Sequence, residues 1–207
     1  MSLIRNNSRR QFLKTSSATL AATSLPLIGQ AEEPAGETLV QQLYSSLDDQ
    51  QRAVLCMPFD HQLRSKVDNN WHITKPHISQ FCTADQQDLV KQIFNSLHSE
   101  QYAKAVYDQV VHDSGKKGFG DSSIAIFGEP GTGKFEFVLT GRHCTRRCDG
   151  DSVEGSAFGG PIFYGHAADS FYEGPDHKGS AYWYQAKSAN ALYAALDGRQ
   201  RKLALID

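Results

Sequence analysis

The chain has 207 residues, 40% of them hydrophobic and 21% charged, and its formal net charge is −2. This length suits one sizeable domain. The composition excludes a disordered chain, and the lack of an apolar run of about 18 residues excludes a polytopic membrane protein. Residues 1–31 carry four basic residues and no acidic one, which leaves 17 basic and 23 acidic residues elsewhere, a net charge of −6. An acidic body excludes a nucleic-acid-binding protein, because such a protein needs a basic face.

The first 31 residues have the three parts of a signal peptide. A basic segment, SRRQFLK (residues 8–14), precedes an apolar stretch at residues 15–28, and GQA (residues 29–31) supplies small residues for cleavage. Paired arginines followed by Phe, Leu and Lys are typical of a twin-arginine signal; an ordinary secretory signal with two chance arginines is the alternative. We therefore expect the twin-arginine translocation machinery to export the protein to the periplasm or beyond, with no membrane span after cleavage. Because this route carries folded proteins, it also points towards a metal or redox centre.

The mature chain, residues 32–207, begins with helical patterns. Apolar residues at helical spacing predict a helix over residues 37–56. Residues 57–81 have no steady period and contain prolines, which indicates a long packed loop. A capping box, TADQ, and an apolar face predict a second helix over residues 84–97, and a serine cap opens a third at residues 100–113.

The remaining sequence is rich in glycine and aromatic residues. Alternating patterns predict strands at residues 122–127 and 135–139, and the composition up to residue 174 indicates short strands and tight turns. Residues 182–196 return to a helical pattern. We therefore expect one α+β domain: an N-terminal helical half, a small, mostly antiparallel sheet rich in Gly and aromatic residues, and a C-terminal helix.

One short sequence occurs twice. LYSSLDDQQR (residues 43–52) and LYAALDGRQR (residues 192–201) are identical at six of ten positions. They are either a true repeat, which implies two similar halves, or a common helix–turn–helix phrase. A true repeat would place the end of the sequence just after the start of its second copy, and residues 203–206 begin an apolar face with nothing after it. We therefore expect the domain to be truncated at its C-terminus.

The segment GEPGTGK (residues 128–134) has the glycine and lysine spacing of a phosphate-binding loop. Phe135 stands where such a loop needs a magnesium-binding Ser or Thr, and the residues that follow alternate as a strand rather than starting a helix. The segment is therefore interpreted as a Gly/Pro hairpin turn.

The segment GRHCTRRCDGD (residues 141–151) concentrates candidate site residues after the second strand. His143, Cys144 and Cys148 are natural ligands for a divalent transition metal such as zinc, copper or iron. A structural disulfide, or a pair of inert thiols, is the alternative in an exported protein. The other two cysteines of the chain would form a second bridge or remain buried thiols.

Three arginines in the same segment suggest another chemistry. Arg142, Arg146 and Arg147 would lower the pKa of a neighbouring thiol or form a pocket for a carboxylate, phosphate or sulfate. In this hypothesis Arg142 is a clamp for a small anionic ligand. A solvated basic turn is the alternative.

Two further histidines lie in turns rich in Gly and aromatic residues. His166 and His177 would join His143 in a three-histidine site, with Glu173 or Asp176 as the base or as a partner that orients a ligand. Turns are where such sites tend to lie. Taken singly, each histidine is more typical of a hydrogen-bonded structural residue.

Several phrases occur together in a particular order: SLDDQQR (residues 46–52), the loop around Trp71, the helix at residues 84–97, IFGEP (residues 126–130) and LTGRH (residues 139–143). This order resembles a family of bacterial exported proteins known as domain of unknown function 3500, over most of residues 40–207. Members tend to have Gly-His-His after the strand, whereas here Arg142 replaces the first histidine and only His143 remains. A metal site built on that pair would therefore lack one ligand. Members also tend to be longer, and the resemblance implies no established activity.

We expect an exported protein with a metal-assisted or otherwise small-molecule-directed site built on His143, His166 and His177. The alternative is a non-catalytic envelope protein that recognises an anionic ligand or a protein partner through its Gly-rich, aromatic half. A truncated, non-functional fragment is the third possibility.

Overall fold

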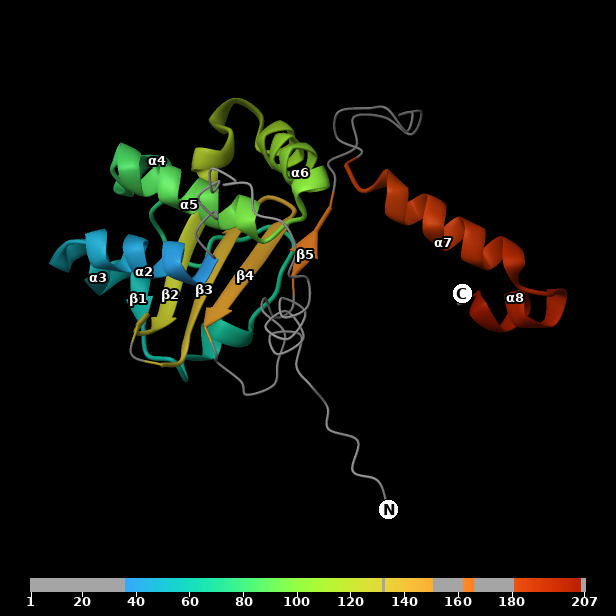
Figure 1. Ribbon diagram of the computed structural model, residues 1–207, viewed down its shortest axis with the longest axis horizontal. Helices are drawn as coiled ribbons and strands as arrows, with labels where there is room; N and C mark the ends of the chain where they lie inside the picture. The colour runs from blue at the N-terminus through green and yellow to red at the C-terminus, as the bar shows by residue number, and fades with distance from the viewer. Residues whose placement is uncertain (1–35, 132, 151–161, 166–180, 206–207) are drawn as a thin grey trace, which may run out of the picture.

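The computed structural model describes residues 36–131, 133–150, 162–165 and 181–205. Within them the chain forms the expected α+β arrangement of helices, then a sheet, then C-terminal helices (Figure 1). The helices are α2 (Gly36–Ser46), α3 (Asp49–Leu55), α4 (Ile78–Phe81), α5 (Ala84–Ser96), α6 (Glu100–Asp113), α7 (Trp183–Ala195) and α8 (Gly198–Ala204), with 3-10 turns η1 (Gln62–Ser65), η2 (Gly115–Lys117) and η3 (Phe119–Asp121). None of the helices among these residues is long and apolar enough to cross a membrane.

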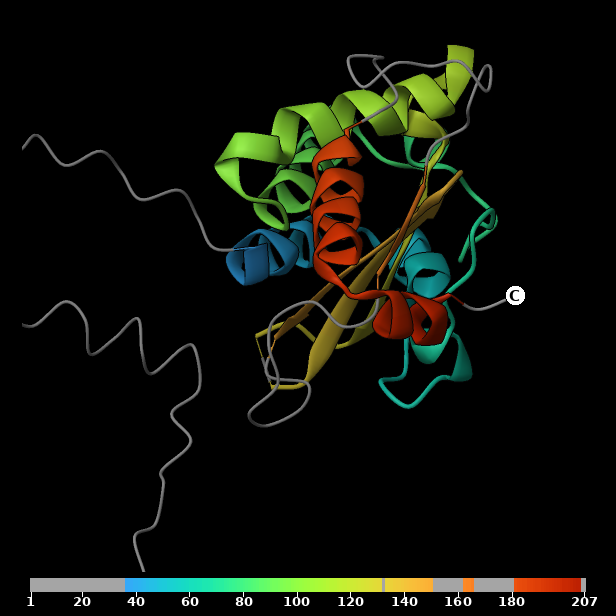
Figure 2. The same cartoon turned by 90° about the vertical axis from the view of Figure 1, so that its right-hand side faces the viewer.

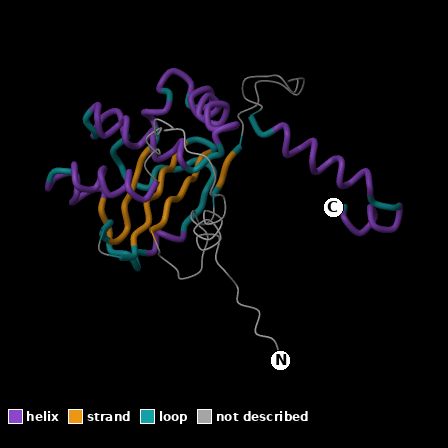
Figure 3. The backbone as a smooth tube through the Cα atoms, viewed as in Figure 1, coloured by secondary structure: helices purple, strands orange, loops and turns teal. Residues whose placement is uncertain are grey.

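The sheet has its five strands side by side in chain order (Figure 3). They are β1 (Cys56–Met57), β2 (Ser123–Gly128), β3 (Phe135–Gly141), β4 (Cys144–Gly150) and β5 (Phe163–Tyr164). β1 is parallel to β2, and every other neighbouring pair is antiparallel. The prediction of a mostly antiparallel sheet is therefore confirmed, although Cys56 of β1 was expected to end a helix and Met57 to begin a loop.

Both faces of the sheet are covered, because successive side chains of a strand point to opposite faces. Helices α2, α5 and α6 pack on one face (Figure 2), against a large apolar core to which β2 and β3 contribute Ile124, Ile126, Phe137 and Leu139. The loop after β1 covers the other face, where a smaller cluster forms around Phe127. A strand covered on both sides has few positions left for water, so even its polar residues become buried.

The predicted helix over residues 37–56 is two helices. Asp48 ends the first by starting a second: its side chain accepts a hydrogen bond from the backbone N–H of Gln51, and the Gln51 side chain accepts from the backbone N–H of Asp48. This capping box satisfies N–H groups that a helix start leaves without partners. Both segments are helical, as the spacing of apolar residues predicted. That spacing continues from α2 into α3, so only the capping residues indicate the break between them.

A second capping box faces the first. Thr83 caps α5 as predicted, through Gln86. The two cap glutamines then exchange side-chain hydrogen bonds in the core, from Gln51 Nε2 to Gln86 Oε1 at 2.8 Å and back at 2.9 Å. Each buried amide is thus satisfied by the other, and the pair fixes the start of α3 against the start of α5. The predicted serine cap of α6 is Ser99, whose side chain makes no cap hydrogen bond.

The repeated phrase has the same local structure in both copies. Asp48 and Asp197 each start a helix through a capping box, and Arg52 and Arg201 each donate to backbone carbonyls at the end of the preceding helix or just after it. The surroundings differ, because α2 and α3 contribute to the core whereas α7 and α8 contain no buried residue. The α7–α8 pair extends away from the sheet (Figure 1).

The GEPGTGK segment connects two antiparallel strands, as predicted for a hairpin turn. β2 ends at Gly128, which pairs with Phe135 at the start of β3. Gly128 has φ of 75°, and a side chain there would collide with the carbonyl oxygen of Lys134. A strand rather than a helix follows the loop, so the segment lacks the helix N-terminus that phosphate binding requires.

The segment after the second predicted strand is itself a strand, which corrects the interpretation as a turn. Its side chains alternate: Cys144, Arg146 and Cys148 lie on the face covered by helices, and Thr145 and Arg147 on the face covered by the loop. Only 2% of Arg146 and 1% of Arg147 is exposed. The interpretation as a solvated basic turn is therefore wrong for Arg146 and Arg147.

Candidate functional site

The turn between β3 and β4 consists of Arg142 and His143. Among the described residues other than glycine, His143 alone has a positive φ, 51°. Its N–H donates to Asn69 O at 2.7 Å and to Asn70 Oδ1 at 3.2 Å, and its carbonyl accepts from Gly165 N at 3.1 Å. These bonds hold an unfavourable backbone conformation, and such conformations concentrate at functional sites.

The imidazole of His143 is oriented by a buried carboxylate. Its Nδ1 lies 3.4 Å from Oδ2 of Asp113, the last residue of α6, and the exposed fractions of the two side chains are 19% and 1%. A carboxylate at the C-terminal, negative end of a helix dipole is stabilised by a nearby hydrogen-bond donor. No described residue makes a hydrogen bond to the other ring nitrogen, Nε2. A histidine held in this way suits proton transfer or metal ligation.

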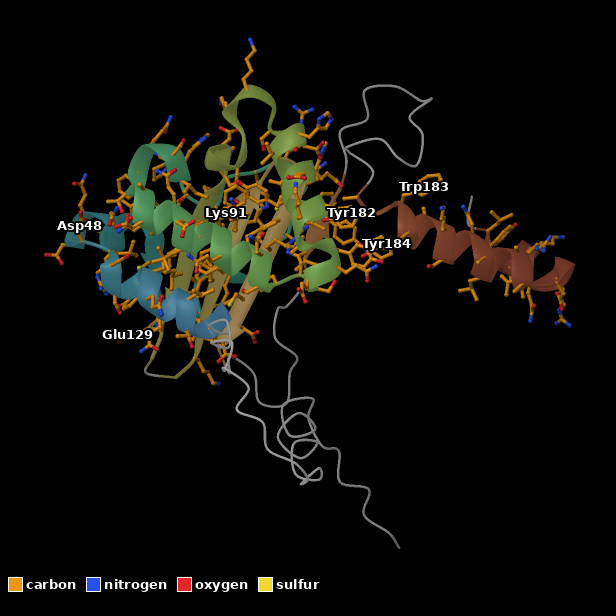
Figure 4. All side chains as sticks on the ribbon, turned by 45° about the horizontal axis from the view of Figure 1, so that its top comes forward. Asp48, Lys91, Glu129, Tyr182, Trp183 and Tyr184 are labelled. Atoms are coloured by element: carbon orange, nitrogen blue, oxygen red, sulfur yellow. The ribbon has the colours of Figure 1, made fainter. Side chains whose placement is uncertain are left out.

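Arg146 lies on β4, three positions after His143, and its hydrogen bonds hold the edge of the sheet together. Its Nε donates to His98 Nε2 at 3.1 Å, and its terminal nitrogens donate to Phe163 O and to the Tyr182 hydroxyl, each at 2.6 Å. Figure 4 shows Tyr182 where α7 leaves the body of the domain. No carboxylate of the described chain pairs with Arg146. The guanidinium is therefore a structural group that joins the segment after α5, β5 and the residue that caps α7.

The partners of Arg146 are kept neutral by burial. Burial, together with the positive charge of Arg146, lowers the pKa of His98 to about 4, although its hydrogen bond to Phe94 O opposes the shift. With Nδ1 facing that carbonyl at 2.8 Å, the neutral ring has Nε2 free to accept from Arg146. Burial likewise raises the pKa of the Tyr182 hydroxyl to about 12.

We expect His98 to make folding stability depend on acid. Its pKa is 6.5 without the fold and about 4 within it, so the unfolded chain binds the extra proton and stability falls as the pH drops from about 6.5 to 4. Allowing for partial exposure, we expect a loss of about 1–2 kcal/mol. Urea unfolding of wild type and His98→Gln at pH 7, 5 and 4 measures it. The variant should lose less stability between pH 7 and pH 4, and equal losses would contradict the assignment.

Arg147 serves the opposite face of the sheet. It forms an ion pair with Oε1 of Glu136, and the other carboxylate oxygen of Glu136, Oε2, lies 3.0 Å from Arg64 Nη1. Arg147 also donates to the carbonyls of Arg64 and Lys66. The predicted pocket of three arginines is therefore wrong: two are buried on opposite faces, and only Arg142 is exposed.

The four cysteines are free thiols, so the predicted disulfide bridges are not formed. Cys144 and Cys148 are four positions apart on one strand, about 13 Å, which is too far for one metal ion to bind both. Burial raises the pKa of both thiols and raises that of Cys56 and Cys82 to about 11. All four behave as small apolar residues rather than as thiolates.

The other predicted site residues lie outside the described part of the chain. They are His166, His177, Glu173 and Asp176. The described chain ends at Gly165 and resumes at residue 181, on either side of this segment.

One group of candidate ligands was missed. His72, His77 and Asp121 each offer one ligand atom, and these atoms lie within 4.8 Å of one another. The signal in the sequence was two histidines five positions apart in the long loop. The aspartate is 44 positions further along, so no local pattern could link it to them.

The fold and the N-terminal signal define an exported α+β protein. Residues 6–26 match a twin-arginine translocation (TAT) pathway signal sequence, which directs the protein across the cytoplasmic membrane to the periplasm or beyond. Residues 31–207 match the family described as protein of unknown function (DUF3500), so the chain belongs to this family. No curated protein and no solved structure matches it. The predicted export route and family are confirmed.

Proposed function

We propose that this exported domain binds a small anionic molecule at the β3–β4 turn, with His143 as its proton-carrying group and Arg142 as the clamp for negative charge. The observation that carries the proposal is the strained backbone of His143 together with the contact of its Nδ1 with buried Asp113. Backbone conformations of this kind are concentrated at functional sites, and here one coincides with a side chain that a buried carboxylate orients.

The chemistry follows from the direction of the imidazole. With a proton on Nδ1 shared with Asp113, Nε2 is the nitrogen that accepts or delivers a proton to a bound molecule. Arg142 is the neighbouring residue of the same turn and is exposed, so its guanidinium is able to bind a carboxylate or phosphate through two parallel hydrogen bonds.

A second candidate function is a metal site at the same histidine. Ligating histidines commonly donate their other ring N–H to a carboxylate, and Asp113 lies in that position relative to His143. His166 and His177 would complete the ligand set, with Glu173 or Asp176 as the base. Zinc, copper and iron are the metals that such ligands favour.

Calorimetric titration with phosphate and citrate as probe anions tests the first function. We expect binding at pH 6 to weaken by about tenfold in His143→Ala and in Arg142→Ala, since each loses one charged hydrogen bond. Arg199→Ala, which removes an exposed arginine of α8, is the control. Equal binding by all variants would rule out an anion site at this turn.

A further inference from the structure

We propose that His72, His77 and Asp121 form a second, separate site that binds a divalent transition metal such as zinc. The three side chains come from the end of the long loop, the residue that precedes α4, and the last residue of η3. Their ligand atoms lie within 4.8 Å of one another. Small side-chain movements would therefore place each of these atoms roughly 2 Å from a shared metal ion, the length of a metal–ligand bond.

The contacts between these side chains already converge on one point. His77 Nδ1 lies 2.7 Å from Asp121 Oδ1, and His72 Nε2 lies 2.9 Å from the backbone oxygen of Asp121. The two imidazoles are stacked, with ring centroids 4.3 Å apart and planes 17° apart. Both histidines therefore direct a nitrogen towards the same aspartate.

The backbone around the group is held in place independently of any ion. Ile78 N donates to Ser122 O at 2.8 Å, and Thr74 Oγ1 donates to Ile124 O at 3.0 Å, which fixes the segment between the histidines against β2. α4 and η3 approach so closely that a side chain at Gly120 would lie 2.8 Å from Ser79 Cβ. The ligands thus belong to packed segments, which reduces the entropy lost on binding.

The set of ligands selects the class of ion. Two imidazoles and one carboxylate suit zinc, iron, nickel or copper, whereas calcium and magnesium prefer oxygen alone. Without an ion, each histidine nitrogen that faces an oxygen of Asp121 carries the proton between them. A metal ion that binds to these nitrogens displaces the protons.

Lys117 forms an ion pair with Asp121, so a metal ion would have to displace it from this carboxylate. Its Nζ lies 3.2 Å from Asp121 Oδ1, but 71% of its side chain is exposed. Burial favours a neutral Asp121, but hydrogen bonds from Lys117 and His77 outweigh it and lower the pKa of the carboxyl group. An exposed ion pair contributes little free energy, so the lysine is able to move into solvent when a divalent ion arrives.

Zinc titration of the full chain by calorimetry, followed by the visible spectrum with cobalt, tests the proposal. We expect one zinc ion to bind at this group, and affinity to fall by about tenfold or more in His72→Ala, His77→Ala and Asp121→Asn. Lys117→Met should bind zinc more tightly, since it removes a positive charge beside the ion. His72 is exposed, so its variant is expected to fold, and its thermal melting curve checks that.

His143→Ala is the control that separates this site from the proposed anion or metal site. Zinc affinity that survives His143→Ala and is lost in His72→Ala supports the second site. Zinc binding that is lost in His143→Ala alone would assign the ion to the β3–β4 turn and overturn the proposal. No zinc binding by wild type below about 100 μM, a free energy near −5.5 kcal/mol, would overturn it as well.

Discussion

Replacing Glu136 by Gln should lower the free energy of unfolding by about 3 kcal/mol, because it removes the negative charge between two arginines. Arg147 is 1% exposed and contacts Glu136 Oε1, and Arg64 lies 3.0 Å from Oε2. Glutamine keeps the size and one acceptor oxygen but no charge, so Arg147 loses its ion pair with β3. Guanidinium chloride unfolding of both proteins at pH 7 measures the difference.

The same variant should loosen the loop that covers the sheet. Arg147 holds that loop through the carbonyls of Arg64 and Lys66, so proteolysis near η1 should become faster. Asp60→Asn, which removes a negative charge at an exposed position of the same loop, is the control and should cost less than about 0.5 kcal/mol. A loss in Glu136→Gln no larger than in this control would show that the ion pair contributes little.

Replacing Gly150 by Ala should destabilise the fold by about 2–3 kcal/mol through overpacking. Gly150 ends β4 opposite Phe135 on β3, and an added Cβ would overlap the Phe135 ring, with Cδ1 at 2.6 Å. Phe135 is only 5% exposed, so its ring has no free space to enter. Thermal and chemical unfolding of the variant give the loss.

A double-mutant cycle identifies the cause. In a Phe135→Leu background the ring edge is gone, and Gly150→Ala should then cost less than about 1 kcal/mol, since contacting residues are energetically coupled. Gly198→Ala is the matched control, because nothing lies within 4 Å of a Cβ at that helical position. It should leave stability unchanged or raise it by up to about 1 kcal/mol. An undiminished cost beside leucine would point away from a clash with Phe135.

Features with a local cause were predictable from the sequence. The capping box at Thr83 and the periodicity after it predicted α5 to within one residue, and α6 (Glu100–Asp113) was predicted at both ends. The Gly/Pro turn and the alternating strands beside it were also correct. In each case the signal and the structure lie within a few positions of one another.

Features that depend on distant partners were not predictable. β4 contains Arg146 and Arg147, two charged residues of a type that is usually exposed. Both are buried, because other segments supply acceptors for their N–H groups. Apart from the carbonyl of the adjacent Thr145, the acceptors named above lie 11 to 83 positions away in the chain. A charged strand becomes an interior strand only when such partners are present.

The candidate site shows the same division. His143 was identified from its residue type and its place after a strand, whereas Asp113, which orients it, lies 30 positions earlier in the chain. The group of His72, His77 and Asp121 had no recognisable pattern, because the fold brings together side chains up to 49 positions apart. The cysteine pair was misleading, since a strand holds its residues apart where a turn would bring them together.

By itself the sequence determined the export signal, the family, the α+β class, most helix positions and the strands β2 and β3, all of which depend on short-range patterns of polarity, capping and composition. Only the tertiary structure decided which arginines are buried, which thiols stay free and which carboxylates orient the histidines. The physical reason is that hydrogen bonding and desolvation depend on neighbours in space. Those neighbours are chosen by the pairing of β3 with β4 and by the loop and helices that cover the two faces of the sheet.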